Sequence, residues 1–98
     1  MIELVVRPAA RQDLANIWSY TATTWSIEQA DFYVGQIGAQ MEKLLVFPEI
    51  GTPLEGLLTG YRKVRTGSHR IIYRTAEQQL IVVRIIHERE DVPDELDT

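Results

Sequence analysis

The apolar residues of this chain change their spacing once, and this change constrains the fold more than any other feature. Between residues 9 and 46 they recur every three or four positions, which is the repeat of an amphipathic helix. Between residues 61 and 87 they fall in short runs that are rich in β-branched residues and bounded by turn residues, as is typical of strands. Helices followed by a run of strands predict an α+β fold.

Two helices are predicted in the first half of the chain. The first covers roughly residues 9–24. Ser26, with Gln29 three positions later, has the pattern of a capping box, so a second helix begins there. It should end near Phe47, because the residue before Pro48 is disfavoured in the helical region. Helices separated by so short a break form an αα-hairpin.

Four strands are predicted around these helices. A β-branched run at residues 2–7 gives an N-terminal strand, and Pro8 ends it. After a loop at residues 48–60 come three strands, at about residues 61–66, 69–76 and 80–87. We expect these three to form an antiparallel meander, with the helices packed on one face of a small, mainly antiparallel sheet. With 98 residues, the chain has room for a single domain, 1–98.

The turns between the last three strands predict their register. A two-residue turn at Gly67-Ser68 places Arg65 opposite Arg70, and a three-residue turn at 77–79 places Arg74 opposite Val82. His69 and His87 then become neighbours. In this register the face toward the helices carries Val64, Ile71, Tyr73, Ile81, Val83 and Ile85. The other face carries Lys63, Arg65, Arg70, Arg74 and Arg84, interleaved with Ile72, Val82 and Ile86.

The net charge of −4 conceals an uneven distribution of charge. Residues 1–58 sum to −4, residues 59–89 to +5 and residues 90–98 to −5. Like charges directly opposite each other in a sheet are destabilising, so Arg65 against Arg70 needs an explanation. Two explanations remain open. Either the basic face binds an anionic partner, or it is a solvated face that the acidic tail at 90–98, which we expect to be weakly ordered, folds back to neutralise.

Several kinds of site are excluded by residue types that the chain lacks. It has no cysteine, which excludes disulfides, thiol catalysis and zinc sites with thiolate ligands, and two histidines cannot build a metal site alone. We therefore predict neither a metal nor a cofactor. The longest apolar run, residues 80–83, is far shorter than the ~20 residues needed to span a bilayer. No signal peptide is apparent, so we expect a cytoplasmic protein without membrane contact.

Two groups of side chains could carry chemistry or binding. His69 and His87 are either a proton-transfer pair or two partly buried residues that bond to the backbone. The aromatic residues of the helical hairpin either pack in the core or line a docking groove for another protein. These aromatic residues are Trp18, Tyr20, Trp25 and Tyr33.

The order of the predicted elements and several short motifs match a known family over almost the whole chain. The matching segments are residues 7–10, 13–14, 17–18, 48–51, 60–63, 67–69, 72–74 and 83–85, with Trp25, Gln29, Ala30, Tyr33, His87, Arg89 and Asp91. Together they resemble the RelE/ParE superfamily of bacterial toxins, and the ParE branch most.

The resemblance implies a toxin of a type II toxin–antitoxin module that inhibits DNA gyrase by binding, and it implies no catalytic residue. It also implies a ParD-like antitoxin whose C-terminal segment packs on the helical hairpin, so that DNA is contacted only through the antitoxin complex. The residues expected to bind the target are Lys63, Arg65, Arg70, Arg74, Arg84 and Arg89. Those expected to bind the antitoxin are Leu14, Trp18, Trp25, Tyr33 and Ile37.

Two other functions remain open at this point. RelE-like relatives cut mRNA in the ribosome, and Arg70 and His87 fall at positions that resemble their catalytic arrangement. The chain departs from it in having neither a well-placed base before Tyr61 nor a C-terminal aromatic acid–base residue. The third possibility is a non-toxic module that only binds an antitoxin.

Overall fold

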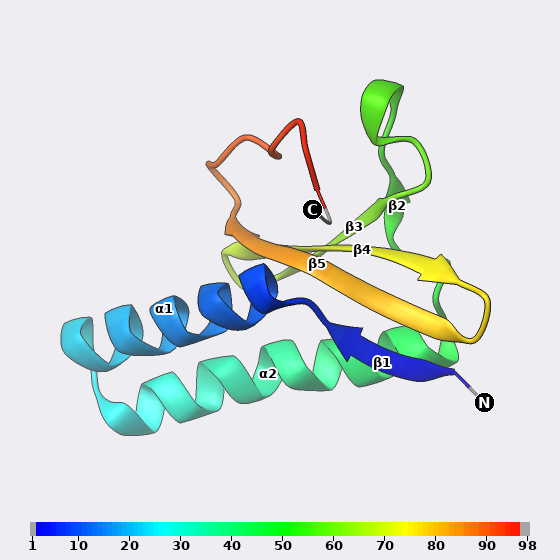
Figure 1. Cartoon of the computed structure of the whole chain (residues 1–98). Coiled ribbons are helices and arrows are strands. Elements are labelled where there is room, and N and C mark those ends of the chain that lie inside the picture. The colour runs from blue at the N-terminus through cyan, green and yellow to red at the C-terminus, as the bar shows by residue number, and fades with distance from the viewer. Residues whose placement is uncertain (1, 97–98) are drawn as a thin grey trace.

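The computed structural model describes residues 2–96, which form two helices packed on one face of a five-stranded sheet (Figure 1). The helices are α1 (Pro8–Thr24) and α2 (Ile27–Val46). The strands are β1 (Glu3–Val6), β2 (Thr52–Pro53), β3 (Arg62–Thr66), β4 (His69–Ala76) and β5 (Gln79–His87), with a short 3-10 helix η1 (Gly56–Leu58) between β2 and β3. The predicted α+β fold is thereby confirmed.

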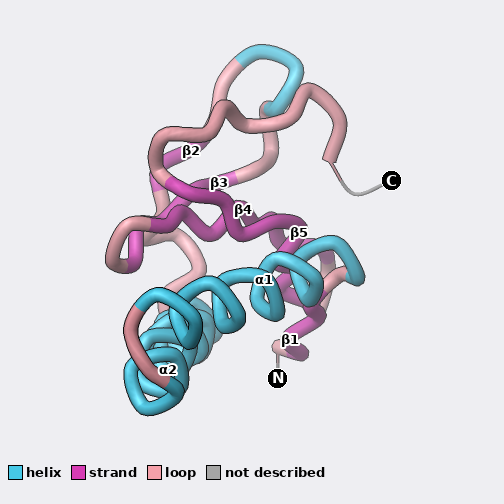
Figure 2. Tube along the Cα trace, turned by 90° about the vertical axis from the view of Figure 1, so that its left-hand side faces the viewer, coloured by secondary structure: helices cyan, strands magenta, loops and turns pink. Residues whose placement is uncertain are grey.

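The strand order across the sheet is β1-β5-β4-β3-β2. The last three strands form the predicted antiparallel meander, and β2 adds two residues at its outer edge. The N-terminal strand β1 runs parallel to β5, with Glu3 opposite Gln79 and Val6 opposite Val82. The sheet is therefore mixed but mainly antiparallel, and Figure 2 shows both helices on the same side of it.

The ends of the helices follow the predicted signals. Pro8 stands at the start of α1, where its missing N–H costs no hydrogen bond. The Ser26 hydroxyl accepts a 3.0 Å hydrogen bond from the Gln29 N–H and so caps α2. The two helices are joined by Trp18 of α1, whose indole Nε1 donates to the Asp31 carboxylate of α2 at 2.8 Å.

The main core lies between the helices and the sheet. From the helices it takes Ala10, Ile17, Ile37, Met41 and Leu44, and from the sheet Ile71, Tyr73, Leu80, Val82 and Ile85. Tyr73 is fully buried, and its hydroxyl donates to the Pro48 carbonyl at 2.7 Å while accepting from the Gly51 N–H at 3.0 Å. A Cβ on Gly51 would come within 2.5 Å of that hydroxyl, so only glycine allows this close approach.

The predicted register is confirmed in one half of the β4–β5 pair and wrong in the other. Arg65 lies opposite Arg70 and His69 opposite His87, as predicted. The turn after β4, however, has two residues rather than three, and Arg74 lies opposite Ile81 instead of Val82. A β-bulge at Ile72/Tyr73 absorbs the difference, because it leaves one residue of β5 without a partner and shifts the alternation of all residues beyond it.

The bulge moves three side chains to the opposite face from the one predicted. Val82 faces the helices rather than the opposite side, whereas Ile81 and Val83 belong to a second apolar cluster with Ile72 and Ile86. Leu80 joins the helix-facing core. The assignments of Val64, Ile71, Tyr73 and Ile85 to the helix side are confirmed.

The second apolar cluster lies on the face of the sheet away from the helices. It consists of the four buried residues Ile72, Ile81, Val83 and Ile86, and it is covered by partly buried side chains from several segments. These are Val5, Leu54, Tyr61, Ala76, Val92 and Leu96. The last two belong to the C-terminal segment, which Figure 1 shows running back over this face. The C-terminal segment therefore folds back over this face, as the second explanation made from the sequence proposed, but the four residues beneath it are buried rather than solvated.

Candidate functional site

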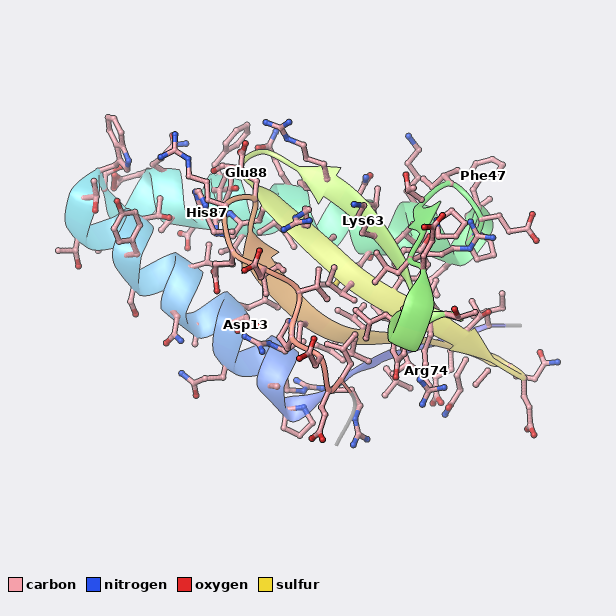
Figure 3. All side chains as sticks on the ribbon, turned by 90° about the horizontal axis from the view of Figure 1, so that it is seen from above. Asp13, Phe47, Lys63, Arg74, His87 and Glu88 are labelled. Carbon is pink, nitrogen blue, oxygen red and sulfur yellow. The ribbon has the colours of Figure 1, made fainter. Side chains whose placement is uncertain are left out.

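The basic residues expected to bind the target do not form one continuous surface. Arg70 and Arg74 lie four positions apart on β4, which corresponds to about 13 Å along a strand. Figure 3 shows the same separation, with His87 and Glu88 at one end of the sheet and Arg74 toward the other. Lys63 lies on β3, opposite Ile72, and is partly exposed. The structure thus brings Arg65, Arg70 and Arg89 to one end of the sheet, and we call these three residues the basic corner.

Each arginine of the basic corner has different surroundings. The Arg65 side chain is 68% exposed, and its guanidinium lies 3.2 Å from the Glu88 carboxylate. Arg70 donates through Nη2 to the Glu90 carbonyl, but its buried Nε has no hydrogen-bond partner among the residues that the structure describes. Arg89 is exposed in the turn after β5. The repulsion between Arg65 and Arg70 is thus offset by separate acceptors.

Arg84 is held by an acidic residue rather than free to meet a target. Its Nε and Nη2 donate to the two carboxylate oxygens of Asp13 at 2.7 and 3.1 Å, and this hydrogen-bonded carboxylate raises the pKa of Arg84. Asp13 also accepts from the Ile85 N–H at 2.8 Å, so its carboxylate ties α1 to β5. A bidentate pair of this kind is a fixed structural contact.

His69 and His87 are neighbours at the same end of the sheet as the basic corner. Their rings meet edge to face, with centroids 5.4 Å apart. His69 Nδ1 lies 2.6 Å from the Tyr33 hydroxyl, which itself accepts a 3.0 Å bond from the Ser68 N–H. Burial, followed by the charge of His87, lowers the pKa of His69. Both factors favour the neutral imidazole, whose Nδ1 can accept a hydrogen bond from the Tyr33 hydroxyl.

His87 is engaged by the backbone that follows it. Its Nδ1 accepts a 3.1 Å hydrogen bond from the Arg89 N–H, and its own backbone N–H donates to the Glu90 carboxylate at 3.0 Å. The carboxylate of the next residue, Glu88, is paired with Arg65. Both histidines are partly buried, as in the second interpretation made from the sequence. Only His87 bonds to the backbone as that interpretation states, whereas His69 bonds to the Tyr33 hydroxyl.

The residues expected to bind an antitoxin differ widely in exposure. Ile37 is fully buried, and Leu14 and Tyr33 are partly buried against the same core. Trp18 is partly buried and bonded to Asp31. Trp25, by contrast, is 75% exposed where the two helices join. Of these five residues, Trp25 has the largest exposed fraction and is therefore the most accessible to a partner.

Further apolar side chains are exposed at the same end of the helices. Tyr20, Ile27 and Phe32 are 70%, 58% and 61% exposed. Phe32 was not among the expected docking residues, because helical periodicity identifies the buried face but does not mark an apolar residue on the outer face. Several large apolar residues exposed at one end of the helical hairpin indicate an interaction surface.

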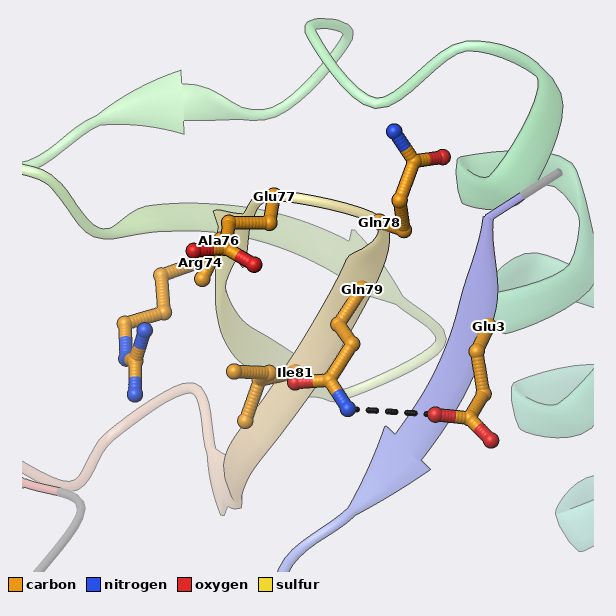
Figure 4. Close-up of a pocket in the computed structure, with 7 residues that line it drawn as sticks. All are labelled: Glu3, Arg74, Ala76, Glu77, Gln78, Gln79 and Ile81. Atoms are coloured by element: carbon orange, nitrogen blue, oxygen red, sulfur yellow. Dashed lines mark hydrogen bonds between the residues drawn. The ribbon is translucent and has the colours of Figure 1, made fainter.

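The open hollow at the other end of the sheet does not have the features of a binding site. It has a volume of about 550 Å³ and lies at the β4–β5 turn (Figure 4). Glu3, Glu77 and Arg74 line it, so it has no strong preference for one sign of charge, and the Gln79 amide donates to Glu3 at 3.1 Å. Within residues 2–96, no three metal-binding side chains gather at one place. None of the helices in that range is both long and apolar enough to span a bilayer.

Comparison with known proteins identifies relatives over nearly the full length. The family described as "ParE toxin of type II toxin-antitoxin system, parDE" matches residues 4–92. A protein named Toxin ParE1 from Mycobacterium tuberculosis is 36% identical over 89 residues, which cover 90% of this chain and 91% of that protein. A protein of the same name from Caulobacter vibrioides is 35% identical over 79 residues and 81% of each chain.

Solved structures share the fold. A chain of the chromosomal ParDE system from P. aeruginosa superposes with a TM-score of 0.77 at 22% identity, covering 89% of this chain and 96% of its own. A chain of the toxin–antitoxin complex RelBE2 from Mycobacterium tuberculosis superposes with a TM-score of 0.59, also at 22% identity, covering 88% and 96%. At this identity the superpositions establish the arrangement of two helices on a mainly antiparallel sheet.

Proposed function

The chain belongs to the ParE toxin family of type II toxin–antitoxin systems, and from that premise we propose that it inhibits DNA gyrase in the cytoplasm by binding, without catalysis. The observation that carries the proposal is the basic corner. Arg65, Arg70 and Arg89 gather at one end of the sheet, where an anionic surface could contact all three. Arg84 contributes through its bond to Asp13, which fixes α1 against β5.

One ring nitrogen of each histidine and the Glu88 carboxylate are already engaged. Cleavage of a phosphodiester requires a general base and a general acid that are free to reach the reacting oxygens. Here Nδ1 of His69 is bonded to Tyr33, Nδ1 of His87 is bonded to the Arg89 N–H, and Glu88 is paired with Arg65. This supports action by binding.

The test is inhibition of purified gyrase in a supercoiling assay. We expect the wild-type chain to inhibit supercoiling. For the same inhibition, the double variant Arg65→Gln/Arg89→Gln should require about tenfold more protein for each contact with an anionic group that it loses. The matched control is Arg11→Gln/Lys43→Gln, which removes two exposed positive charges from the helices. It should inhibit like the wild type. Unchanged supercoiling with the wild-type chain, or equal loss in both double variants, would overturn the proposal.

One observation favours a second function, cleavage of ribosome-bound mRNA. Arg70 and His87 lie at the same end of the sheet, on neighbouring strands, since Arg70 is opposite Ile86. This function predicts cut transcripts in growth-arrested cells and their loss in Arg70→Ala and His87→Ala. Intact transcripts during growth arrest would eliminate it, and normal growth on expression without an antitoxin would instead favour a non-toxic binding module.

We also propose that a ParD-like antitoxin neutralises the chain by docking on the helical hairpin. The family is described as part of a toxin–antitoxin system, and a structural neighbour belongs to a ParDE system. The exposed side chains Tyr20, Trp25 and Phe32 offer such a partner an apolar surface. Contact with DNA would then belong to the antitoxin in the complex.

A further inference from the structure

The second apolar cluster is covered in part by the chain's own C-terminal segment. Val92 and Leu96 pack against Ile72, Ile81, Val83 and Ile86, whose side chains are at most 6% exposed. Figure 3 views this face, and Figure 1 shows the segment crossing it. We call these four buried residues, together with Arg70 at their rim, the tail-covered face.

Within the described residues, the C-terminal segment is attached to this face by side-chain contacts rather than by strand pairing. Glu90 is fixed at the start, because its N–H donates to the His87 carbonyl and its carboxylate accepts from the His87 N–H. Beyond Glu90, none of the main-chain groups of residues 91–96 bonds to the main chain of another described residue. Val92 and Leu96 are both only partly buried. Among the described residues, a competing segment would therefore displace two apolar side chains and the hydrogen bond from Arg70 to the Glu90 carbonyl, but no strand pairing.

Arg70 shows that the segment fills its place incompletely. Its Nη2 donates to the Glu90 carbonyl, while the neighbouring Nε is buried and has no hydrogen-bond partner within residues 2–96. Buried donors are nearly always satisfied in native proteins. A carboxylate would satisfy both nitrogens at once, since Nε and Nη2 form the fork that binds carboxylates in a bidentate manner.

Charge favours an acidic occupant. Residues 59–89, which include β3 to β5, carry a net charge of +5, whereas the C-terminal residues 90–98 carry five acidic and no basic side chains. The covering segment thus combines two apolar residues four positions apart with acidic residues around them. That combination matches an apolar cluster with a basic rim.

We propose that the tail-covered face is a docking surface for an acidic protein segment with two apolar residues, and that residues 90–96 occupy it until such a partner segment replaces them. The partner's carboxylate binds Arg70 through Nε and Nη2, and its apolar residues take the places of Val92 and Leu96. The inference rests on the proposed function only in assuming that the target binds this face of the sheet. Peptide binding can be measured without gyrase, so either proposal can fail alone.

The experiment measures binding of a labelled peptide in trans by fluorescence anisotropy. The probe is a fluorescein-labelled synthetic peptide with the sequence of residues 90–98, added to the full-length chain. If the tail leaves the face open only about a tenth of the time, the apparent affinity of the wild-type chain is reduced about tenfold. We therefore expect the variant Val92→Ser/Leu96→Ser to bind the peptide about tenfold more tightly than the wild type, and the gain to disappear when Arg70→Gln is added.

Two controls separate the apolar contacts from charge alone. Val46→Ser/Ile50→Ser removes a similar pair of side chains, 68% and 46% exposed, outside both apolar clusters, and should bind like the wild type. A peptide with serine in place of Val92 and Leu96 should not distinguish the tail variant from the wild type. Equal binding of the normal peptide by wild type and tail variant overturns the proposal, as does equally tight binding of the serine peptide to the variant. If circular dichroism shows the double variant unfolded, Leu96→Ser alone should give about a threefold gain, and no gain overturns the proposal.

Discussion

Tyr33 determines which form of His69 fits the native structure. Its hydroxyl accepts a hydrogen bond from the Ser68 N–H and lies 2.6 Å from His69 Nδ1. The hydroxyl can donate a hydrogen bond to this nitrogen only when the nitrogen is unprotonated. A protonated His69 would turn Nδ1 into a donor and remove this acceptor. The hydroxyl would then have to turn to the Thr66 carbonyl, 3.4 Å away, which is a poorer bond.

This arrangement predicts that acid destabilises the protein through His69. The pKa of His69 is lower in the folded state than in the unfolded state, so the folded protein binds fewer protons. The contribution of neutral His69 to the free energy of unfolding is therefore lost as the pH falls below the ordinary value near 6.5. We expect the urea midpoint of unfolding to decrease between about pH 7.5 and 5.5 and to depend less on pH in His69→Gln. An identical pH dependence in both proteins would contradict this assignment.

The turn between β3 and β4 packs against Tyr33 of α2. Gly67 has a φ of +60°, and a Cβ added to it would lie 2.6 Å from the Tyr33 ring. The two-residue turn at Gly67-Ser68 was predicted from the sequence, because glycine and serine suit a hairpin. Its contact with the helix was not, since nothing in a local turn motif indicates which distant side chain will pack against it.

Replacement of Gly67 by alanine should destabilise the protein by about 2 kcal/mol. Alanine in the left-handed region costs about 1 kcal/mol, and the contact with Tyr33 adds to it, because the ring is held by His69 and Ser68. Gly56→Ala is the matched control. Its φ is +68°, but apart from its chain neighbours no atom of the part of the chain that the structure describes lies within 4 Å of the added Cβ, so Gly56→Ala should lose only the backbone part. Denaturant unfolding measures both, and an equal loss would show that the Tyr33 contact contributes nothing.

At the level of elements, the sequence predicted which segments form helices and strands but not every side-chain orientation in the sheet. The capping box at Ser26 and the proline after Phe47 are local signals, and both helix boundaries followed from them. The bulge at Ile72/Tyr73 has no such signal. Because its extra residue shifts the alternation of β5, Ile81 and Val83 were assigned to the wrong face. Burial of Leu80 in the main core stabilises the register that is observed.

At the level of the whole molecule, charge and apolar surface are distributed over different parts of the chain. The split between a basic strand region and an acidic tail was visible in the sequence, and the structure places the two in contact on one face of the sheet. The basic residues were identified as target-binding candidates, and their division between two ends of the sheet follows from the four-position spacing of Arg70 and Arg74 along β4. The helical hairpin, on the opposite face, is left as the separate surface that an antitoxin could occupy.

This separation predicts that antitoxin docking depends on exposed residues of the hairpin and not on the basic corner. Trp25 is 75% exposed, so Trp25→Ala should leave the thermal unfolding midpoint nearly unchanged. A tryptophan anchored in a protein interface costs about 2 kcal/mol or more when truncated, so affinity for a ParD-like antitoxin should fall about 30-fold. Phe47→Ala is the matched control, since Phe47 is 57% exposed after the far end of α2. Calorimetric titration of the antitoxin into each variant measures the effect. Full affinity in Trp25→Ala, or an equal loss in Phe47→Ala, would show that the antitoxin docks elsewhere.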